Sequence, residues 1–484
     1  MTGRTMEKSV LWTAAEVAEA TGGRARGNWS ATGVSIDSRT LQPRDLFVAI
    51  AGPSFDGHDF VADAMARGAA AAIVSRPVDG VTDENLLVVD DCFAALSNLG
   101  GAARSRTRAT VIAVTGSVGK TGTKDALKTT LGRYSSVHAS MGNLNNHWGL
   151  PLSLARLPRD TDFAVLEIGM NHSGEISPLT RLACPHVALI TTVQPVHSEF
   201  FANTEEIADA KAEIFEGVVA GGAVVLNRDN PFFDRLASAA RNLGIERIVG
   251  FGANEAADVR LLGVQKQSDG SVVRAAIGFE IYRFSIGIPG RHWVDNGLAV
   301  LATVWAAGGD VVAVAASLAD LRAPKGRGRH HRIRTALGEF KLIDESYNAS
   351  PVSMGAAFEN LGLATPQGQG RRIAVLGDML ELGSQSPDLH AGLAEPLRRN
   401  RIAKVFTAGT DMERLWEALP QDMRAGHAAD AETLAPMVTA AVRPGDVVMV
   451  KGSAGSRIAG VVEALLALGV DSGNGASKKV VNGS

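Results

Sequence analysis

Cysteine is scarce in this chain of 484 residues, which contains only Cys92 and Cys184. The two lie far apart and match neither a disulfide framework nor a metal-binding knuckle, so we interpret both as small apolar side chains that become buried. No apolar run reaches the length of a membrane-spanning helix, and the N-terminal segment lacks the apolar core of a signal peptide. These absences predict a cytoplasmic protein that is not inserted in a membrane.

An excess of charge of either sign is also missing. The chain has 48 Lys and Arg residues against 51 Asp and Glu residues, and its formal net charge is −3. Such a balance does not favour a nucleic-acid backbone as the main partner, so we expect small-molecule ligands. No internal repeat of solenoid length is present, which argues against a repeat architecture.

Short β-branched runs alternate with alanine-rich segments along most of the chain. Such runs are typical of strands that are buried on both faces of a parallel sheet. A length of 484 residues suggests about three domains at roughly 150 residues each. We therefore predict an α/β fold with an N-terminal α/β domain, a central domain with a mostly parallel sheet and a Rossmann-like C-terminal domain.

Two polar stretches indicate where these domains meet. Residues 102–110 are basic and polar, and residues 322–334 combine proline, glycine and charge. Residues 471–484 lack an apolar pattern and are predicted to form a disordered tail. The predicted domains span residues 1–106, 107–325 and 326–470.

The clearest motif, VIAVTGSVGKTGTKDALKTTL at residues 111–131, lacks one expected glycine. The phosphate-binding pattern G-x-x-x-x-G-K-[ST] requires glycine at position 114, where this chain has Val114. We predict a strand, a turn and a helix here, with Gly116 and Gly119 letting backbone N–H groups approach phosphate at the helix N-terminus. A glycine turn without a ligand is the alternative, but G-K-T in this setting favours a shorter phosphate loop.

In this interpretation the central domain is P-loop ATPase-like. Lys120 would contact the β- and γ-phosphates, and the Thr121 hydroxyl would bind Mg²⁺. The predicted nucleotide-binding residues of the loop are Thr115, Gly116, Ser117, Val118, Gly119, Lys120 and Thr121.

Two later strand ends carry polar residues. Glu167 ends the apolar run in DFAVLEIG, where a carboxylate is costly without a cation; Mg²⁺ would suit it, and an ion-paired or capping Glu is the alternative. His197 follows the next strand, at the edge where ligands gather in open α/β sheets. Read alone, a single His is more often structural.

The loop T-G-x-x-G-K-T followed by T-K resembles that of the Mur ligase family, ATP-dependent enzymes that build the peptide of bacterial cell-wall precursors. The resemblance runs over roughly residues 30–460. One departure is Gly122, where the family has a threonine; it removes a hydroxyl contact at that position but leaves the roles of Lys120 and Thr121.

The resemblance implies a substrate loop and two metal sites. MGNLNNHWGLPLSL would be the substrate loop, with an asparagine-rich turn as the alternative; its candidate residues are Asn143, Asn145 and Asn146. Thr121 would bind one Mg²⁺, and a second Mg²⁺ would lie near Glu167, His197 and Lys211. Lys211, in the motif A-K-x-E-I-F, matches a lysine that many members carry as a carbamate; a surface Lys paired with Glu213 or Glu216 is the alternative.

Later blocks are similar to those with which the family binds ATP and the incoming amine. Asn296 would contact the adenine, Asp344 the ribose hydroxyls, and Arg327, or its rival Arg329, the γ-phosphate. The residues implied for the amine and for an anionic substrate group are Tyr347, Asn348 and Lys451. The implied catalytic residues are Lys120, Glu167, His197, Lys211 and Arg327.

Residues 34–69 resemble the UDP-binding domain shared by two members of the family. Ser38 and Arg39, after Asp37, would lie near the UDP group, and His58 would help close a loop; a simple Ser-Arg turn is the alternative. LGDMLELG and DESYNASP resemble blocks of the member that adds a dipeptide, whereas D-N-P-R, with which another member grips diaminopimelate, is absent.

The implied reaction joins D-Ala-D-Ala to UDP-MurNAc-tripeptide through an acyl phosphate, with ATP and two Mg²⁺, in a monomer. Both meso-diaminopimelate and L-lysine stay open as the third peptide residue. Another precursor ligase or a folylpolyglutamate synthase is the alternative within the superfamily, although the latter begins close to its phosphate loop. A GTPase-like switch would need a guanine-reading N-K-x-D, which we do not find in the expected region.

Overall fold

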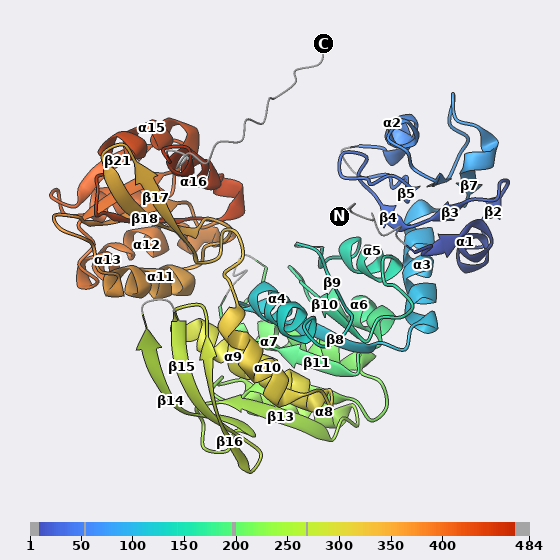
Figure 1. Ribbon diagram of the computed structural model, residues 1–484, viewed down its shortest axis with the longest axis horizontal. Helices are drawn as coiled ribbons and strands as arrows, with labels where there is room; N and C mark the ends of the chain where they lie inside the picture. The colour runs from blue at the N-terminus through green and yellow to red at the C-terminus, as the bar shows by residue number, and fades with distance from the viewer. Residues whose placement is uncertain (1–8, 53–54, 143, 196–199, 268–269, 470–484) are drawn as a thin grey trace, which may run out of the picture. The chain divides into compact units, whose positions relative to one another are not determined.

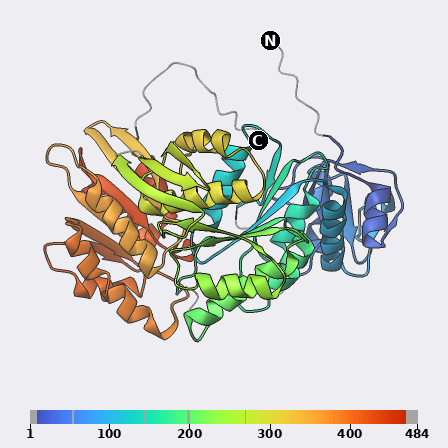
Figure 2. The same cartoon turned by 90° about the horizontal axis from the view of Figure 1, so that it is seen from below.

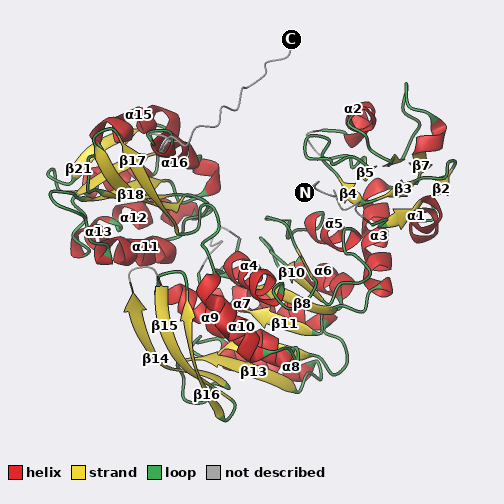
Figure 3. Ribbon diagram, in the orientation of Figure 1, coloured by secondary structure: helices red, strands yellow, loops and turns green. Residues whose placement is uncertain are grey.

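The computed structural model describes residues 9–52, 55–142, 144–195, 200–267 and 270–469. The chain forms two compact units, Met1–Leu321 and Arg322–Ser484 (Figure 1). Helices and strands alternate through both units, as Figure 3 shows. Within the described residues no helix has the length and apolar character needed to cross a membrane. The domain boundaries at residues 106 and 325 stay a prediction.

The first unit begins with a small five-stranded sheet in the order β2-β7-β6-β5-β4. Its strands from β4 to β7 are parallel, and β2 is antiparallel to β7. The strands are β2 (Arg24–Ala25), β4 (Gly33–Ser35), β5 (Asp45–Val48), β6 (Ala71–Val74) and β7 (Leu86–Val88). The accompanying helices are α1 (Ala14–Thr21), α2 (Val61–Ala66) and α3 (Cys92–Arg106), and a short antiparallel pair is made by β1 (Trp12–Thr13) and β3 (Ser30–Ala31).

The larger sheet of this unit has nine strands in the order β16-β15-β14-β13-β12-β11-β8-β10-β9. Neighbours from β9 to β14 are parallel, and β14, β15 and β16 form an antiparallel edge. The strands are β8 (Thr110–Thr115), β9 (Val137–Ala139), β10 (Phe163–Glu167), β11 (Val187–Ile190), β12 (Ala223–Asn227), β13 (Arg247–Gly252), β14 (Val259–Gln267), β15 (Gly270–Ile277) and β16 (Glu280–Ile286).

Helices cover both faces of this sheet, because its central strands are apolar on both sides (Figure 2). One face packs on α5 (Gly149–Ala155), α6 (Ile176–Ala183), α7 (Thr204–Ala212) and α8 (Phe233–Asn242). The other face carries α4 (Lys120–Leu131), α9 (Arg291–Ala306) and α10 (Val311–Ser317). Helix α5 also packs on α3, which joins the small sheet to the large one.

The second unit is a six-stranded sheet in the order β17-β18-β22-β19-β20-β21, parallel except for β17. The strands are β17 (Arg329–Thr335), β18 (Gly338–Glu345), β19 (Arg372–Gly377), β20 (Lys404–Ala408), β21 (Arg424–Ala428) and β22 (Val447–Lys451). Separate apolar cores fill its two faces. The helices are α11 (Pro351–Leu363), α12 (Ser386–Ala391), α13 (Ala394–Arg399), α14 (Met412–Ala418), α15 (Ala431–Ala441) and α16 (Ala459–Leu466).

The two cysteines differ in their surroundings. Cys92 is buried at the start of α3, and this burial raises the pKa of its thiol to about 12. Cys184 is only partly buried, so the expectation of burial was wrong for this residue. It caps α6 in the left-handed conformation, with φ of +43°, which places it at a chain reversal rather than in the core.

Candidate functional site

The predicted phosphate loop connects β8 to α4, with its turn between Thr115 and Lys120. Val114 is still inside the strand and fully buried, so the loop proper starts two residues later than in the usual pattern. Gly116 has φ of +144° and Gly119 has φ of +91°, a region that L side chains rarely adopt. A Cβ atom at Gly116 would lie 2.0 Å from the Thr191 hydroxyl oxygen, which explains why this position requires glycine.

The segment that follows β11 holds the loop in shape. The Thr191 hydroxyl donates to the Val118 carbonyl oxygen at 2.6 Å, and the Ser117 backbone N–H donates to the Thr192 carbonyl oxygen at 2.8 Å. The Ser117 hydroxyl is 3.0 Å from the Gln194 carbonyl oxygen. The sequence analysis missed these supporting residues, because their role depends on β11 lying next to β8.

Two lysines approach the loop from different elements. The Lys120 ammonium donates to the Gly116 carbonyl oxygen at 2.6 Å. Lys211, near the end of α7, is 2% exposed, and within the described residues its ammonium makes no hydrogen bond or ion pair. Burial, and then the positive charge of Lys120, lower the pKa of Lys211 well below its usual value.

The alternative interpretation of Lys211 as a surface ion pair was therefore wrong. Glu213 accepts hydrogen bonds from backbone N–H groups at the start of α6, including those of Gly174 and Ile176. Glu216 pairs with Arg181 at 2.9 Å. Both carboxylates therefore have partners other than Lys211. Lys211 is a buried amine near Lys120 of the phosphate loop.

Glu167 ends β10, which pairs with β8 so that Glu167 lies opposite Val114. Its Oε1 atom accepts from the Thr121 hydroxyl at 3.2 Å and from the Asn145 side-chain amide at 2.9 Å. Its Oε2 atom is buried and has no hydrogen-bond partner among the described residues; the ammonium of Lys124 lies 4.0 Å away. An unpaired buried carboxylate oxygen beside a hydroxyl is the kind of site that suits a hard cation.

The asparagine loop reaches this site from the side of β9. Asn145 contacts Glu167 as described, and the Asn146 side chain accepts the Gly149 backbone N–H at 2.9 Å at the start of α5. Asn143 and His197 lie outside the described residues, so their predicted roles stay predictions. Among the residues that are described, no group of three or more His, Cys, Asp or Glu side chains is placed to hold a metal ion.

Asn296, in α9, packs against the first turn of α4. A Cβ atom at Gly122 would lie 3.1 Å from the Asn296 side-chain nitrogen and 3.2 Å from the Trp293 ring. This crowding gives a reason for glycine at position 122, where we noted the departure from the family pattern. The predicted adenine contact of Asn296 stays a prediction.

The remaining residues of the nucleotide and amine sites group together within the second unit. The Arg327 guanidinium lies over the Tyr347 ring at 4.2 Å, and the buried Lys451 ammonium donates to the Asn348 carbonyl oxygen at 2.9 Å.

Asp344 is buried and accepts from the backbone N–H of Gly326 and from Ser346, so it orders the chain around Arg327. Arg329 begins β17, opposite Asp344 in the neighbouring strand.

The predicted UDP-binding residues lie in the small sheet domain, where Ser38 is buried and Arg39 is exposed and paired with Asp37. Nearby, the His58 ring donates from Nδ1 to Asp56 at 2.6 Å, because its Nε2 atom accepts the Ser75 backbone N–H at 2.9 Å. The backbone N–H of His58 holds the pKa of Asp56 well below its usual range. These contacts connect residues 56–58 to Ser75, which follows β6.

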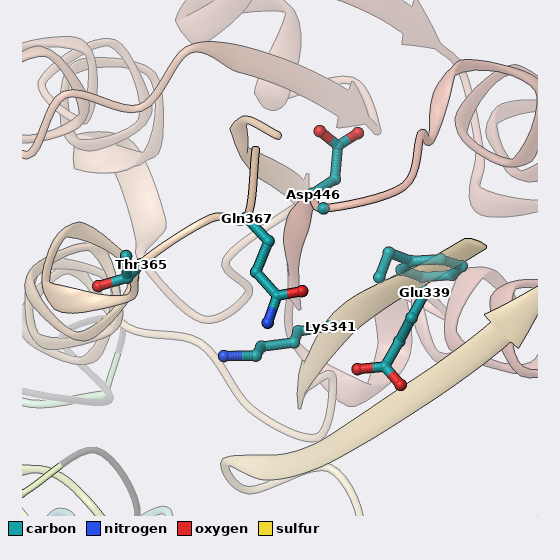
Figure 4. A pocket seen from close by; sticks show the side chains of 7 residues that line it. Glu339, Lys341, Thr365, Gln367 and Asp446 are labelled. Atoms are coloured by element: carbon teal, nitrogen blue, oxygen red, sulfur yellow. The ribbon is translucent and has the colours of Figure 1, made fainter. Parts of the chain in front are cut away.

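A separate pocket lies in the second unit, at the amino-terminal ends of β18 and β22 (Figure 4). Its lining residues are Glu339, Phe340, Lys341, Thr365, Gln367, Gly445 and Asp446. Asp446 is already paired with Arg371 at 2.8 Å. Because the pocket is at the end of the strands opposite to Asp344 and Lys451, it is not part of the candidate site.

A strand, a glycine loop and a helix that carry Lys120 and Thr121, with Glu167 beside them, define a nucleotide-binding α/β enzyme of the P-loop type. Three family models match: the Mur ligase family catalytic domain at residues 30–95, the Mur ligase middle domain at 114–304, and the Mur ligase glutamate ligase domain at 328–454. The chain belongs to the Mur ligase family.

Known relatives match over nearly their whole length. A protein of Rickettsia prowazekii, named UDP-N-acetylmuramoyl-tripeptide--D-alanyl-D-alanine ligase, is 33% identical over 454 residues, which are 94% of this chain and 99% of the relative. A crystal structure of MurF from Acinetobacter baumannii has a TM-score of 0.80 and 29% identity, covering 94% of this chain and 99% of that chain. MurF ligase from Thermotoga maritima, in complex with ADP, has a TM-score of 0.73 and 28% identity, covering 90% and 97%. The predicted fold class and the family resemblance are confirmed.

Replacing Gly119 with alanine should weaken nucleotide binding, because the new Cβ would lie 2.9 Å from the Asn296 side-chain oxygen as well as straining the backbone. Gly80→Ala is the matched control: Gly80 has φ of +77°, and nothing lies within 4 Å of its Cβ position. Both variants should lose about 1–2 kcal/mol of stability from the left-handed backbone. Titration calorimetry with ADP should show reduced affinity only for Gly119→Ala; equal affinities in the two variants would contradict the role of the loop.

Proposed function

We propose that this protein is an ATP-dependent ligase that joins D-alanyl-D-alanine to UDP-N-acetylmuramoyl-tripeptide in peptidoglycan precursor synthesis. The observation that carries the proposal is the match, over 94% of this chain and 99% of the relative, to a ligase named for this reaction. The nucleotide loop, Glu167 and Lys211 supply groups that such a reaction requires. We place the reaction in the cytoplasm and expect the enzyme to act as a monomer.

ATP would bind at the loop between β8 and α4, where the backbone N–H groups and the helix N-terminus favour phosphate oxygens. Lys120 already lies over this loop and would move onto the β- and γ-phosphates. From the second unit, Arg327 or Arg329 would reach the γ-phosphate and Asp344 the ribose, with Asn296 at the adenine. The relative from Thermotoga maritima was solved in complex with ADP, which supports binding of an adenine nucleotide by this protein.

The residues around Glu167 fit Mg²⁺. The Oε2 atom of Glu167 has no hydrogen-bond partner among the described residues, and the Thr121 hydroxyl is 3.2 Å from Oε1. Thr121 and Glu167 would hold one cation, and a carbamate on Lys211, together with His197, would hold a second. When bound, these cations would neutralise the charge between a carboxylate and the triphosphate.

The chain's own residues would then position two reactants in turn. The terminal carboxylate of the tripeptide attacks the γ-phosphate of ATP, which gives an acyl phosphate and releases ADP. The amine of D-alanyl-D-alanine attacks the acyl carbon, forms the amide bond and releases phosphate. Lys120 and Arg327 would stabilise the transferred phosphoryl group. The UDP precursor would be bound by Asn145, Asn146, Ser38 and Arg39. The dipeptide would be bound by Tyr347, Asn348 and Lys451.

The experiment that tests this function measures ATP turnover with UDP-N-acetylmuramoyl-tripeptide, with and without D-alanyl-D-alanine, and follows the peptide by mass. We expect ADP together with a product heavier by the dipeptide. Parallel assays with meso-diaminopimelate and with L-lysine as third residue would identify the natural precursor by kcat/KM. Hydrolysis that ignores the dipeptide, or AMP as the product, would overturn the ligase proposal and leave only a nucleotide site.

A further inference from the structure

Lys124 lies one helical turn after Lys120 in α4 and is 2% exposed. A lysine is rarely buried to this extent unless its ammonium is fully paired. Its ammonium donates to the Ser140 carbonyl oxygen at 2.9 Å and lies 3.4 Å from the Gly142 carbonyl oxygen. It also pairs with Asp125 at 3.1 Å.

The two carbonyl oxygens accept hydrogen bonds from the Lys124 ammonium, and Asp125 adds an ion pair. Glu167 Oε2 receives no hydrogen bond from the Lys124 ammonium, which lies 4.0 Å away. The lysine supplies a positive charge close to the carboxylate and leaves that oxygen open. Its hydrogen bonds go instead to backbone carbonyl oxygens of the segment that follows β9.

The backbone held by Lys124 leads directly into the asparagine loop. The Ser140 hydroxyl accepts the Glu167 backbone N–H at 3.2 Å, and the Asn145 carbonyl oxygen accepts the Gly169 backbone N–H at 2.9 Å. Further along, the His147 ring contacts Phe93 of α3, with ring centroids 5.8 Å apart. The segment thus extends from the phosphate-loop helix to the small sheet domain.

We infer that Lys124 is a positioning residue that fixes this segment to α4 and so places Asn145 against Glu167 for binding of the UDP-linked precursor. The inference rests on the proposed function, and it assigns Lys124 to the precursor side of the reaction. In the proposed function Lys120 and Thr121, one turn earlier, serve the nucleotide and its Mg²⁺. Loss of the Lys124 ammonium should therefore weaken binding of the precursor far more than binding of ATP.

The test compares Lys124→Met with Lys128→Met, a control in the exposed last turn of the same helix. Methionine keeps an apolar chain of similar length and removes the ammonium. We expect the KM for the precursor to rise about 10-fold or more in Lys124→Met, the size typical of lost hydrogen bonds to a charged group, while the KM for ATP changes by less than about twofold. Lys128→Met should match the wild type in both values.

Hydrogen exchange gives a measure that does not depend on activity. Amides at residues 144–150 and 168–170 should exchange faster in Lys124→Met than in the wild type, and those of 111–131 should not. An unchanged precursor KM with unchanged exchange would overturn the inference, and so would an equal loss of ATP and precursor affinity. If Lys124→Met does not fold, Lys124→Gln, whose amide keeps two N–H donors but no charge, is measured in the same way and must show the same selectivity.

A failure of the proposed function would look different. In that case the wild type itself would make no dipeptide adduct and would not bind the UDP precursor in calorimetry. If the wild type ligates the dipeptide and Lys124→Met behaves like Lys128→Met, the ligase assignment stands and only the role of Lys124 is wrong.

Discussion

Lys211→Ala is expected to lower kcat on the order of 100- to 1,000-fold, the loss seen when a group that stabilises transition-state charge is removed. The reason lies in the environment of this lysine. It is 2% exposed, and burial together with the charge of Lys120 keeps its pKa well below the usual value. A lowered pKa increases the share of the neutral amine, the form that can attack CO₂ to form a carbamate and release a proton. The anion that results would lie beside Lys120.

Chemical rescue separates this role from simple packing. Short carboxylic acids such as formate or acetate should restore part of the activity of Lys211→Ala, because they can occupy the space of the carbamate. Lys128→Ala, at an exposed position, should keep full activity and show no response to these acids. Carbon-13 bicarbonate should give a carbamate signal by NMR in the wild type that is absent from Lys211→Ala. Full activity of Lys211→Ala without any added acid would contradict the prediction.

The same pKa shift predicts how stability depends on pH in buffer free of CO₂. The unfolded chain protonates Lys211 below pH about 10.4, whereas the folded protein does so only well below that value. The unfolded state therefore binds more protons between the two pKa values, and Lys211 contributes stability that rises with pH over this window, by about 1.4 kcal/mol per unit. Urea unfolding at several pH values should show that the free energy of unfolding rises less steeply with pH in Lys211→Ala than in the wild type.

The sequence predicted the elements whose signal is local. The apolar runs gave the parallel strands β8, β10 and β11, and the G-K-T motif gave the loop between β8 and α4. Short continuous apolar runs were the signal there, because strands buried on both faces are apolar throughout. The carboxyl ends of those strands then brought Thr121 and Glu167 together, as expected for neighbours in an open sheet.

What the sequence could not predict depends on contacts between distant segments. Lys124 reads as one more charged residue on a helix, and its burial follows only from the position of the Ser140 carbonyl oxygen. The support of the loop by Thr191 requires β11 to lie beside β8. Glycine at position 122 looked like a departure from the family until Asn296 and Trp293 of α9 were found against it.

Glu167→Gln is expected to reduce kcat on the order of 100- to 1,000-fold and to raise the Mg²⁺ concentration needed for half-maximal activity. The amide keeps the size of the side chain and one oxygen that can accept from Asn145, so the loop should stay in place. It removes the negative charge, and an NH₂ group at the position of Oε2 would turn a donor toward the Lys124 ammonium, 4.0 Å away. ADP binding measured without Mg²⁺ should be nearly unchanged.

Glu175→Gln provides the control, because Glu175 is exposed and pairs with His172 in the chain segment that follows β10. Its Mg²⁺ dependence and kcat should match the wild type. An unchanged Mg²⁺ requirement in Glu167→Gln would show that the open oxygen of Glu167 does not serve a cation. The carboxylate would then be interpreted as the partner that orders Thr121 and Asn145, and the cation would have to be held by groups other than this strand end.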